Sequence, residues 1–340
     1  MSELRYNRLK DTWTIIAEER AKRPHDYKEY TKEEATQIEN CPFEYGNEHM
    51  TPPEVFAIRE KNTKPNSSGW KVRVVPNKYP AVSPQTPLDY FFRCIYDNVT
   101  GFGYHEVIID TPDHFKQIQD FNKEDFQYLF TAFKERLKAL SNDNRIKYIH
   151  IFKNHRKEAG KSLYHSHSQL IALPMIPKLV DTQINQSRSY YKQKERCLLC
   201  DEVMYELETE ERILYKNEKF VVYCPYASLY PFEIRIVPYP HSYSFLEIKK
   251  FDYLIDAVKV AVKKLNNTLL DPPFNLILYT SPPKRDNYKI PDYFYNIEIF
   301  NHWYIEILPR ITTHAGFELG TGYYINPVPP ETAVNKLKQE

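Results

Sequence analysis

One order of sequence patterns occurs twice along this chain of 340 residues, and the repeat limits the folds open to it. In the first half, short strand-like runs bounded by Pro, Asn or Gly precede a histidine, an amphipathic helix, a further strand and a His-x-His segment. The second half repeats this order and ends in His-x-Tyr. The spacings between these landmarks differ, so their order, rather than a fixed period, indicates the repeat. We therefore expect two halves descended from one duplicated unit.

The two helices are expected at Lys123–Leu140 and Phe251–Leu265, because each places its apolar residues on one stripe of 3.6-residue period. Asn122 is suited to cap the first of them. Strands are expected at 70–75, 105–110, 148–154 and 169–173, and then at 212–215, 219–223, 233–238, 275–279 and 302–308. The sequence thus predicts an α+β fold in which each half is an antiparallel sheet with packed helices. We expect the halves to be residues 1–178 and 179–340.

The bulk composition excludes several classes of protein. Lys and Arg number 46 against 45 Asp and Glu, a formal charge of +1 that lacks the basic excess of a nucleic-acid binder. No apolar run approaches the roughly 20 residues of a membrane span, and the first residues lack the apolar core of a signal peptide. Five cysteines are too few for a disulfide framework. We expect a cytoplasmic protein that binds neither nucleic acid nor membrane.

The segment His165-Ser-His167-Ser-Gln169 is the most informative for chemistry. In an extended strand these three polar side chains point the same way, because side chains alternate between faces. A neutral imidazole is a competent nucleophile, and its attack on a nucleotide α-phosphorus would divide one difficult displacement into two easier ones. Gln169 would donate to phosphoryl oxygens without acting as a base. Taken alone, however, a His-x-His strand is more often a metal site or a buried pair.

The His-x-His-x-Gln segment, with its approach through Asn154, Gly160 and Ser162, resembles the signature of galactose-1-phosphate uridylyltransferases, the transferase branch of the histidine-triad superfamily. The resemblance covers nearly the whole chain and implies two histidine-triad-like halves. Further matching segments begin at Arg20, Cys41, Val75, His105, Cys197, Cys224, Pro231 and Gly316. By this resemblance His167 is the nucleophile, and Gln169 beside it donates a hydrogen bond to the phosphate.

The same resemblance implies the remaining substrate contacts. The phosphates would be held by Asn154, Gly160, Ser162 and Gln169, and the nucleoside by Asn77. Arg20 and Arg23 would reach phosphate, in this family often across the interface of a homodimer, although their spacing alone favours a solvated charge cluster. Gly322 and Tyr323 lie where the family's C-terminal tail contacts the sugar, and Tyr323 could equally belong to the core.

A complete zinc ligand set occurs in the second half: Cys197, Cys200, His241 and His302. Two thiolates and two imidazoles are typical of a closed structural zinc site. A Cys-x-x-Cys pair can also be redox-active, but a thioredoxin-like sequence context is lacking. We therefore expect a structural zinc ion here.

The corresponding set in the first half is Cys41, Glu44, His114 and His165, with glutamate where the family often has a second cysteine. Glutamate can ligate zinc through oxygen, so this set would bind metal more weakly. A metal-free site held by hydrogen bonds fits equally well. Together the two sets predict one or two zinc ions per chain.

The expected reaction is ping-pong nucleotidyl transfer through His167, with one nucleophile per chain because Tyr304 replaces histidine in the second half. The leading assignment is UDP-glucose:galactose-1-phosphate uridylyl transfer, in galactose metabolism. The substrates would be a nucleotide-sugar and a sugar 1-phosphate or phosphate. The alternatives are an ADP-glucose phosphorylase-like or adenylylsulfate:phosphate adenylyl transferase, and a non-catalytic, zinc-stabilised nucleotide-binding protein.

Overall fold

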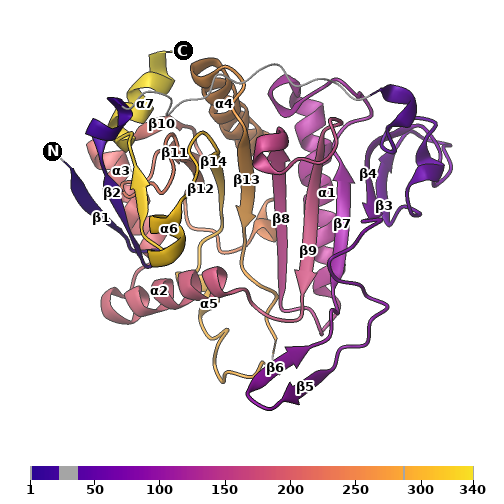
Figure 1. Cartoon of the computed structure of the whole chain (residues 1–340), viewed down its shortest axis with the longest axis horizontal. Helices are drawn as coiled ribbons and strands as arrows, with labels where there is room; N and C mark the ends of the chain where they lie inside the picture. Colours follow the sequence, from indigo (N-terminus) through magenta and orange to yellow (C-terminus); the bar gives the residue numbers. More distant parts are fainter. Residues whose placement is uncertain (1, 23–36, 286–287, 340) are drawn as a thin grey trace.

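A computed structural model describes residues 2–22, 37–285 and 288–339, and within them one large sheet spans the molecule (Figure 1). Neighbouring strands in this sheet are antiparallel throughout. In sheet order the strands are β10 (Ile213–Lys216), β11 (Phe220–Tyr223), β12 (Ile234–Pro238), β14 (Tyr304–Pro309), β13 (Phe274–Tyr279), β8 (Tyr148–His155), β9 (His167–Leu173), β7 (Tyr104–Ile109), β4 (Trp70–Pro76) and β3 (Phe56–Arg59).

The strands of the two halves follow equivalent orders when each is counted from its edge of the sheet toward the middle. From one edge the order is β3, β4, β7, β9, β8, and from the other it is β10, β11, β12, β14, β13. The register repeats as well: Phe152 pairs with Gln169, Ile277 pairs with Glu306, and Phe152 pairs with Ile277 where the halves meet. The duplicated α+β fold is thereby confirmed. The division at residues 178 and 179 stays a prediction.

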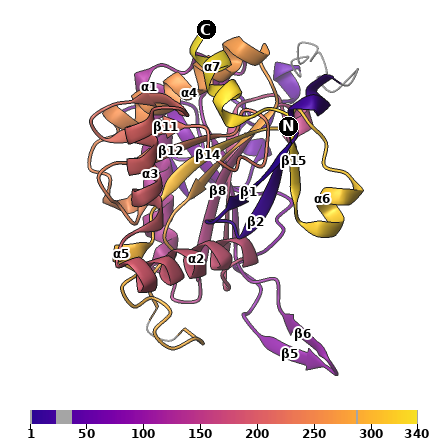
Figure 2. The ribbon, with the colours of Figure 1, turned by 90° about the vertical axis from the view of Figure 1, so that its left-hand side faces the viewer.

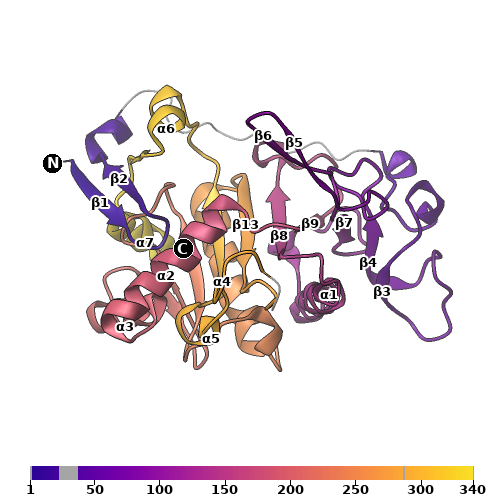
Figure 3. The ribbon, with the colours of Figure 1, turned by 90° about the horizontal axis from the view of Figure 1, so that it is seen from below.

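One helix from each half packs on the same face of the sheet. Helix α1 (Lys123–Ser141) lies beneath β8 and β9 in Figure 3, and α4 (Asp252–Leu269) contacts β10 and β11. Their apolar stripes and the facing strand residues form the largest buried cluster. The cap at Asn122 is confirmed, because its side chain accepts from the Asp125 N–H. Every predicted strand occurs within two residues of its expected bounds.

The other face is covered in the C-terminal half by a smaller sheet and by helices. Strands β1 (Glu3–Asn7) and β2 (Thr12–Ile16) pair with β15 (Tyr324–Asn326) in a three-stranded sheet (Figure 1). The helices beside them are α2 (Lys178–Lys194), α3 (Leu198–Thr209), α5 (Ile297–Phe300) and α6 (Gly316–Thr321). Helix α7 (Pro330–Gln339) instead contacts α4 and β10, and its apolar residues join the cluster on the α1 and α4 face.

Shorter elements complete the described chain. A hairpin of β5 (Tyr90–Arg93) and β6 (Tyr96–Val99) extends away from the body (Figure 2). The 3-10 turns are η1 (Glu18–Lys22), η2 (Ile38–Asn40), η3 (Glu48–Met50), η4 (Ile118–Asp120), η5 (Lys157–Ala159) and η6 (Phe245–Glu247). Across the described residues, no helix has the length and apolar character needed to cross a membrane.

Candidate active site and metal centres

His167 begins β9 and faces away from α1, with its side chain 4% exposed. Its Nδ1 lies 2.8 Å from the His165 carbonyl oxygen. A carbonyl can only accept a hydrogen bond, so the ring proton is on Nδ1 and the lone pair is on Nε2. Burial lowers the pKa of His167 to about 4, which keeps the imidazole neutral at physiological pH. The arrangement presents Nε2 as a nucleophilic atom.

A buried ion pair holds the backbone on which His167 stands. The Lys153 ammonium lies 2.7 Å from Asp110 Oδ2 and 2.8 Å from Ser166 Oγ, and also donates to the His167 carbonyl at 3.2 Å. Both charged side chains are almost fully buried. Lys153 of β8 is thus tied to the end of β7 through Asp110 and to the start of β9 through Ser166 and His167, so three neighbouring strands fix the position of the imidazole.

Gln169 lies on the same face as His167, two residues along β9, and is only partly buried. Its Oε1 is 3.0 Å from Nε2 of His105, a residue of β7. Asn77, just after β4, places its Nδ2 3.1 Å from the same nitrogen, and its Oδ1 accepts from the Tyr79 N–H. No functional role was expected of His105 from the sequence. Its signal was a histidine at a strand start, which becomes informative only once the β7–β9 register is known.

Asn154, at the end of β8, holds the loop that approaches β9. Its Nδ2 donates to the Gly160 carbonyl at 3.2 Å, and its Oδ1 accepts from Asn275 of β13 at 2.8 Å. Gly160 has φ of 92°, and a Cβ there would lie 3.3 Å from Asn154 Nδ2, so this turn favours glycine. Ser162 is exposed beyond it. Asn275, which also donates to the Ala159 carbonyl, is a second residue that sequence patterns did not single out.

The remaining predicted substrate contacts lie toward the other half. Arg20 is in η1, which follows β2, and β2 pairs with β15. Arg23 lies outside the described residues. Gly322 and Tyr323 line a cavity of about 350 Å³ with residues of β13 and β14, and Tyr323 is 38% exposed rather than part of the core. The structure therefore does not gather these residues around His167 by any contact within the described part of the chain.

The predicted C-terminal ligand set comes together in space: Cys197, Cys200, His241 and His302. Their candidate ligand atoms all lie within 4.8 Å of one another. Both imidazoles turn Nδ1 toward the sulfurs and direct Nε2 at a backbone carbonyl 3.0 Å away. The carbonyls fix the tautomer that leaves Nδ1 free to ligate, as in second-shell support of zinc sites. Two thiols and two such imidazoles fit a closed tetrahedral zinc site.

The first-half set also converges, with a carboxylate in one position. Cys41 Sγ is 3.7 Å from His165 Nδ1, and Glu44 Oε2 lies 3.2 Å from His114 Nδ1 and 3.9 Å from His165 Nδ1. His165 Nε2 donates to the Thr111 carbonyl at 2.7 Å, which again turns Nδ1 inward. His165 itself lies in the bend before β9, not in the strand as predicted. The candidate ligand atoms of Cys41, His114 and His165 lie within 4.8 Å of one another and fit a zinc ion, and Glu44 lies beside both imidazoles.

In the C-terminal half the equivalent face of the sheet carries charged side chains. By strand register, Glu306 is equivalent to Gln169, and Arg235 is equivalent to Val107. Arg235 bonds to both Glu306 and Glu202, while Lys10 of the β1–β2 turn reaches Glu306 at 2.8 Å.

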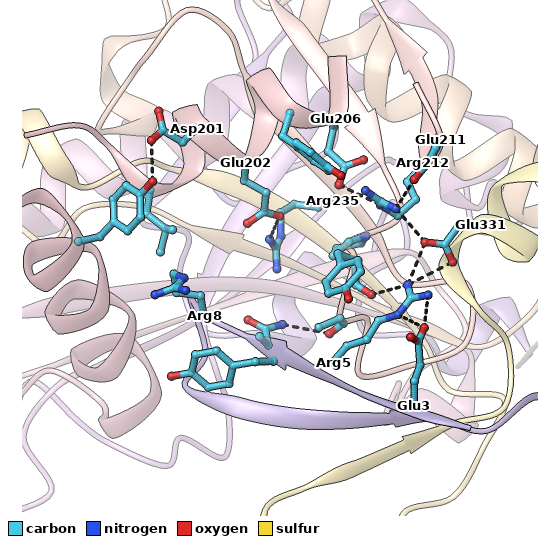
Figure 4. Close-up of a pocket in the computed structure, with 18 residues that line it drawn as sticks. Glu3, Arg5, Arg8, Asp201, Glu202, Glu206, Glu211, Arg212, Arg235 and Glu331 are labelled. Carbon is cyan, nitrogen blue, oxygen red and sulfur yellow. Dashed lines mark hydrogen bonds and ion pairs between the residues drawn. The ribbon is translucent and has the colours of Figure 1, made fainter. Parts of the chain in front are cut away.

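A cavity of about 750 Å³ lies beside Arg235, lined by residues of β1 and α3. Figure 4 shows ion pairs among its charged side chains, with Arg5 and Arg212 converging on Glu331.

Comparison with known proteins agrees with this geometry. Residues 1–177 match the family model described as galactose-1-phosphate uridyl transferase, N-terminal domain. An ADP-glucose phosphorylase from Arabidopsis thaliana is 34% identical over 99% of this chain and 92% of its own length. A galactose-1-phosphate uridylyltransferase from Thermotoga maritima is 28% identical over 100% of this chain and 98% of its own.

Solved structures of the same two kinds of enzyme are similar to this chain. The structure of an ADP-glucose phosphorylase from Arabidopsis thaliana with bound ADP-glucose has a TM-score of 0.82 to this chain. It covers 100% of this chain and 99% of that one at 31% identity. A uridylyltransferase structure, at 24% identity and a TM-score of 0.73, has the same fold over 100% of this chain and 98% of its own.

Proposed function

The chain belongs to the galactose-1-phosphate uridyl transferase family, and from that premise we propose that it transfers a nucleotidyl group through a covalent intermediate on His167. The observation that carries the proposal is the tautomer of His167. Its Nδ1–H is committed to the His165 carbonyl, so the nucleophilic lone pair is on Nε2. A purely structural histidine would not need to leave Nε2 free on the strand face that it shares with the partly exposed amide of Gln169.

In the first step Nε2 attacks the α-phosphorus of a nucleotide-sugar. The N–P bond forms, the bond from phosphorus to the β-phosphate oxygen breaks, and a sugar 1-phosphate leaves with the electron pair. Positive charge develops on the imidazole and is stabilised by the His165 carbonyl. Negative charge on the phosphoryl oxygens is stabilised by amide N–H groups, of which Gln169 is the one on the same strand face.

In the second step an oxygen of a phosphate-bearing acceptor attacks the same phosphorus. The new P–O bond forms, the N–P bond breaks, and the neutral imidazole is regenerated. Gln169 cannot deprotonate water, which favours transfer to phosphate over hydrolysis. The Asn154 turn at Gly160 would border the phosphates, and Asn77 the nucleoside.

We propose an adenylyl donor of the ADP-glucose type, with inorganic phosphate as acceptor. This proposal rests on the 34% identity to an ADP-glucose phosphorylase and on the TM-score of 0.82 to such an enzyme with bound ADP-glucose. It differs from the uridylyl assignment expected from the sequence. That assignment remains the second candidate, because the matching family model and the Thermotoga maritima relative are uridylyl transferases.

The zinc ions are proposed to be structural. Cys197, Cys200, His241 and His302 would hold one, and the Cys41 set a second, where the ion would order the segment preceding His167. We also propose a homodimer in which Arg20, Arg23 and the tail at Gly322 act on the partner subunit. This arrangement would explain why Arg20 follows β2, which pairs with β15 of the C-terminal tail.

The test is incubation with ADP-glucose or UDP-glucose without acceptor, followed by mass spectrometry of the peptide that contains His167. One nucleotidyl group should be added, with stoichiometric release of glucose 1-phosphate. The ratio of kcat/KM for ADP-glucose with phosphate to that for UDP-glucose with galactose 1-phosphate then identifies the base. A ratio well below one would replace the adenylyl assignment with the uridylyl one and leave the role of His167 standing. Turnover without any adduct would refute the mechanism.

A further inference from the structure

His105 contacts the amide of Gln169 from the neighbouring strand β7. It lies on β7 opposite Ile171, so its side chain is on the same face as Gln169 and one step diagonal to it. Its Nδ1 accepts a hydrogen bond from the Ala81 backbone N–H at 3.1 Å, and its Nε2 meets Gln169 Oε1 at 3.0 Å. Both ring nitrogens therefore have a partner: Nδ1 contacts Ala81 of a loop, and Nε2 contacts Gln169, the proposed hydrogen-bond donor to phosphate.

The Ala81 contact sets the tautomer of His105. A backbone N–H can only donate, so Nδ1 carries no proton and the single proton of the neutral ring is on Nε2. Two amides approach Nε2, but Asn77 turns its nitrogen toward it because its oxygen is held by the Tyr79 N–H. Only Gln169 presents an oxygen, so the Nε2–H donates to Gln169.

An amide has one oxygen and one nitrogen end, and the two ends have opposite effects on a phosphoryl group. With Oε1 bound by His105, the NH₂ group of Gln169 is left to donate to a phosphoryl group bound on the strand face that Gln169 shares with His167. The reversed amide would place a carbonyl oxygen against negatively charged phosphoryl oxygens. The orientation of one side chain thus decides whether Gln169 assists or opposes transfer.

We propose that His105 is a positioning residue that holds Gln169 in the orientation that donates to the transferring phosphoryl group. The proposal rests on the proposed nucleotidyl transfer through His167. His105 does not touch the phosphorus or the nucleophile. It acts through the chain Ala81 N–H, His105, Gln169, in which each hydrogen bond fixes the direction of the next.

The test is the single-turnover rate of adduct formation on His167, measured at saturating nucleotide-sugar with whichever of ADP-glucose and UDP-glucose labels the wild type. His105→Leu should lower this rate by roughly tenfold, because the amide loses the bond that selects its orientation. The half-saturating concentration should change little, since ground-state binding is not the affected step. His105→Gln supplies both an acceptor for Ala81 and a donor for Gln169, so it should restore most of the rate.

A double-mutant cycle separates positioning from a structural role. In a Gln169→Leu background, adding His105→Leu should change the rate by less than about twofold, because the group on which it acts is gone. A further tenfold loss in that background, or a wild-type rate in His105→Leu alone, would overturn the proposal. Absence of any adduct in the wild type would instead refute the proposed function, so the two failures are distinguishable. Thermal unfolding of each variant checks that the partly exposed site still folds.

Discussion

The two halves of the sheet place different chemistry at equivalent positions. Where the first half has His167 and Gln169, the second has Tyr304 and Glu306 in the same register. In the first half the two side chains stand at a face where Gln169 is partly exposed. In the second, Tyr304 and Glu306 are buried beneath the β1–β2 turn and α3. One copy of the unit has kept an accessible face, and the other has turned that face into an interior.

Burial explains why the second half carries so many ion pairs. Four charged side chains are buried there, and each carboxylate lies close to a cation: Lys10, Arg235, Glu233 and Glu306. Burial nonetheless raises the pKa of Glu233 to about 7. An isolated charge there would be very costly, so the charges are retained as a set. In the first half the uncharged Val107 and Gln169 stand at the register positions of Arg235 and Glu306, so no such set of charges is needed there.

The largest expected difference between the halves is in catalysis. His167→Ala should lower turnover by at least about 10⁴-fold and abolish the adduct, since it removes the nucleophile. Tyr304→Phe should leave turnover within about twofold and should not reduce stability, because the buried Tyr304 hydroxyl has no hydrogen-bond partner among the described residues. Steady-state rates and the mass of the labelled peptide provide the measurement. An active His167→Ala variant would remove the distinction between the halves.

Stability should show the opposite asymmetry. Lys10→Met should lower the free energy of unfolding by about 3–5 kcal/mol, because it leaves Glu306 and Glu233 buried with one cation fewer. Adding Glu306→Gln should recover part of this loss by removing the uncompensated charge. Chemical denaturation measures both variants. If Lys10→Met is as stable as the wild type, the ion set is not what holds β1 and β2 against the second half.

Much of this comparison was accessible from the sequence. The apolar stripes of 123–140 and 251–265 predicted both helices, and the Cys and His order predicted two clusters that the fold assembles. What escaped was everything that depends on register or on long sequence separation. His105 meets Gln169 through strand pairing, Asn275 meets Asn154 where the halves join, and Lys10 reaches Glu306 across 296 positions. Local patterns hold no information on such contacts.

The metal clusters offer a smaller contrast. Cys200→Ser should reduce bound zinc and lower the melting temperature by roughly 6 °C, since a lost ligand of a closed site costs about 3 kcal/mol in a chain of this size. Glu44→Ala should lower it by no more than about 2 °C, because a lone carboxylate adds less to the affinity of the first site. Neither change should alter the rate of adduct formation on His167 in the soluble fraction. Elemental analysis and thermal unfolding test this order, and equal shifts would contradict it.

The smallest expected difference lies at the N-termini of the two equivalent helices. Helix α1 begins with a reciprocal cap, in which Asn122 and Asp125 each accept from the other's backbone N–H. Helix α4 has Phe251 at its N-cap position, where no side chain caps the helix. Its first residue, Asp252, pairs with Lys123 at the surface. Satisfying helix N–H groups stabilises more than an exposed ion pair does, because solvent screens the latter.

Asn122→Ala should therefore lower the free energy of unfolding by about 1 kcal/mol, while Asp252→Ala should produce no measurable change. Urea denaturation in low and high salt gives the measurement, and salt should not diminish the Asn122 effect, because the cap is a local hydrogen bond. A larger loss in Asp252→Ala than in Asn122→Ala would mean that the Lys123 pair, which joins the first turns of α1 and α4, contributes more than the cap. The two helices would then be stabilised at their junction rather than each at its own end.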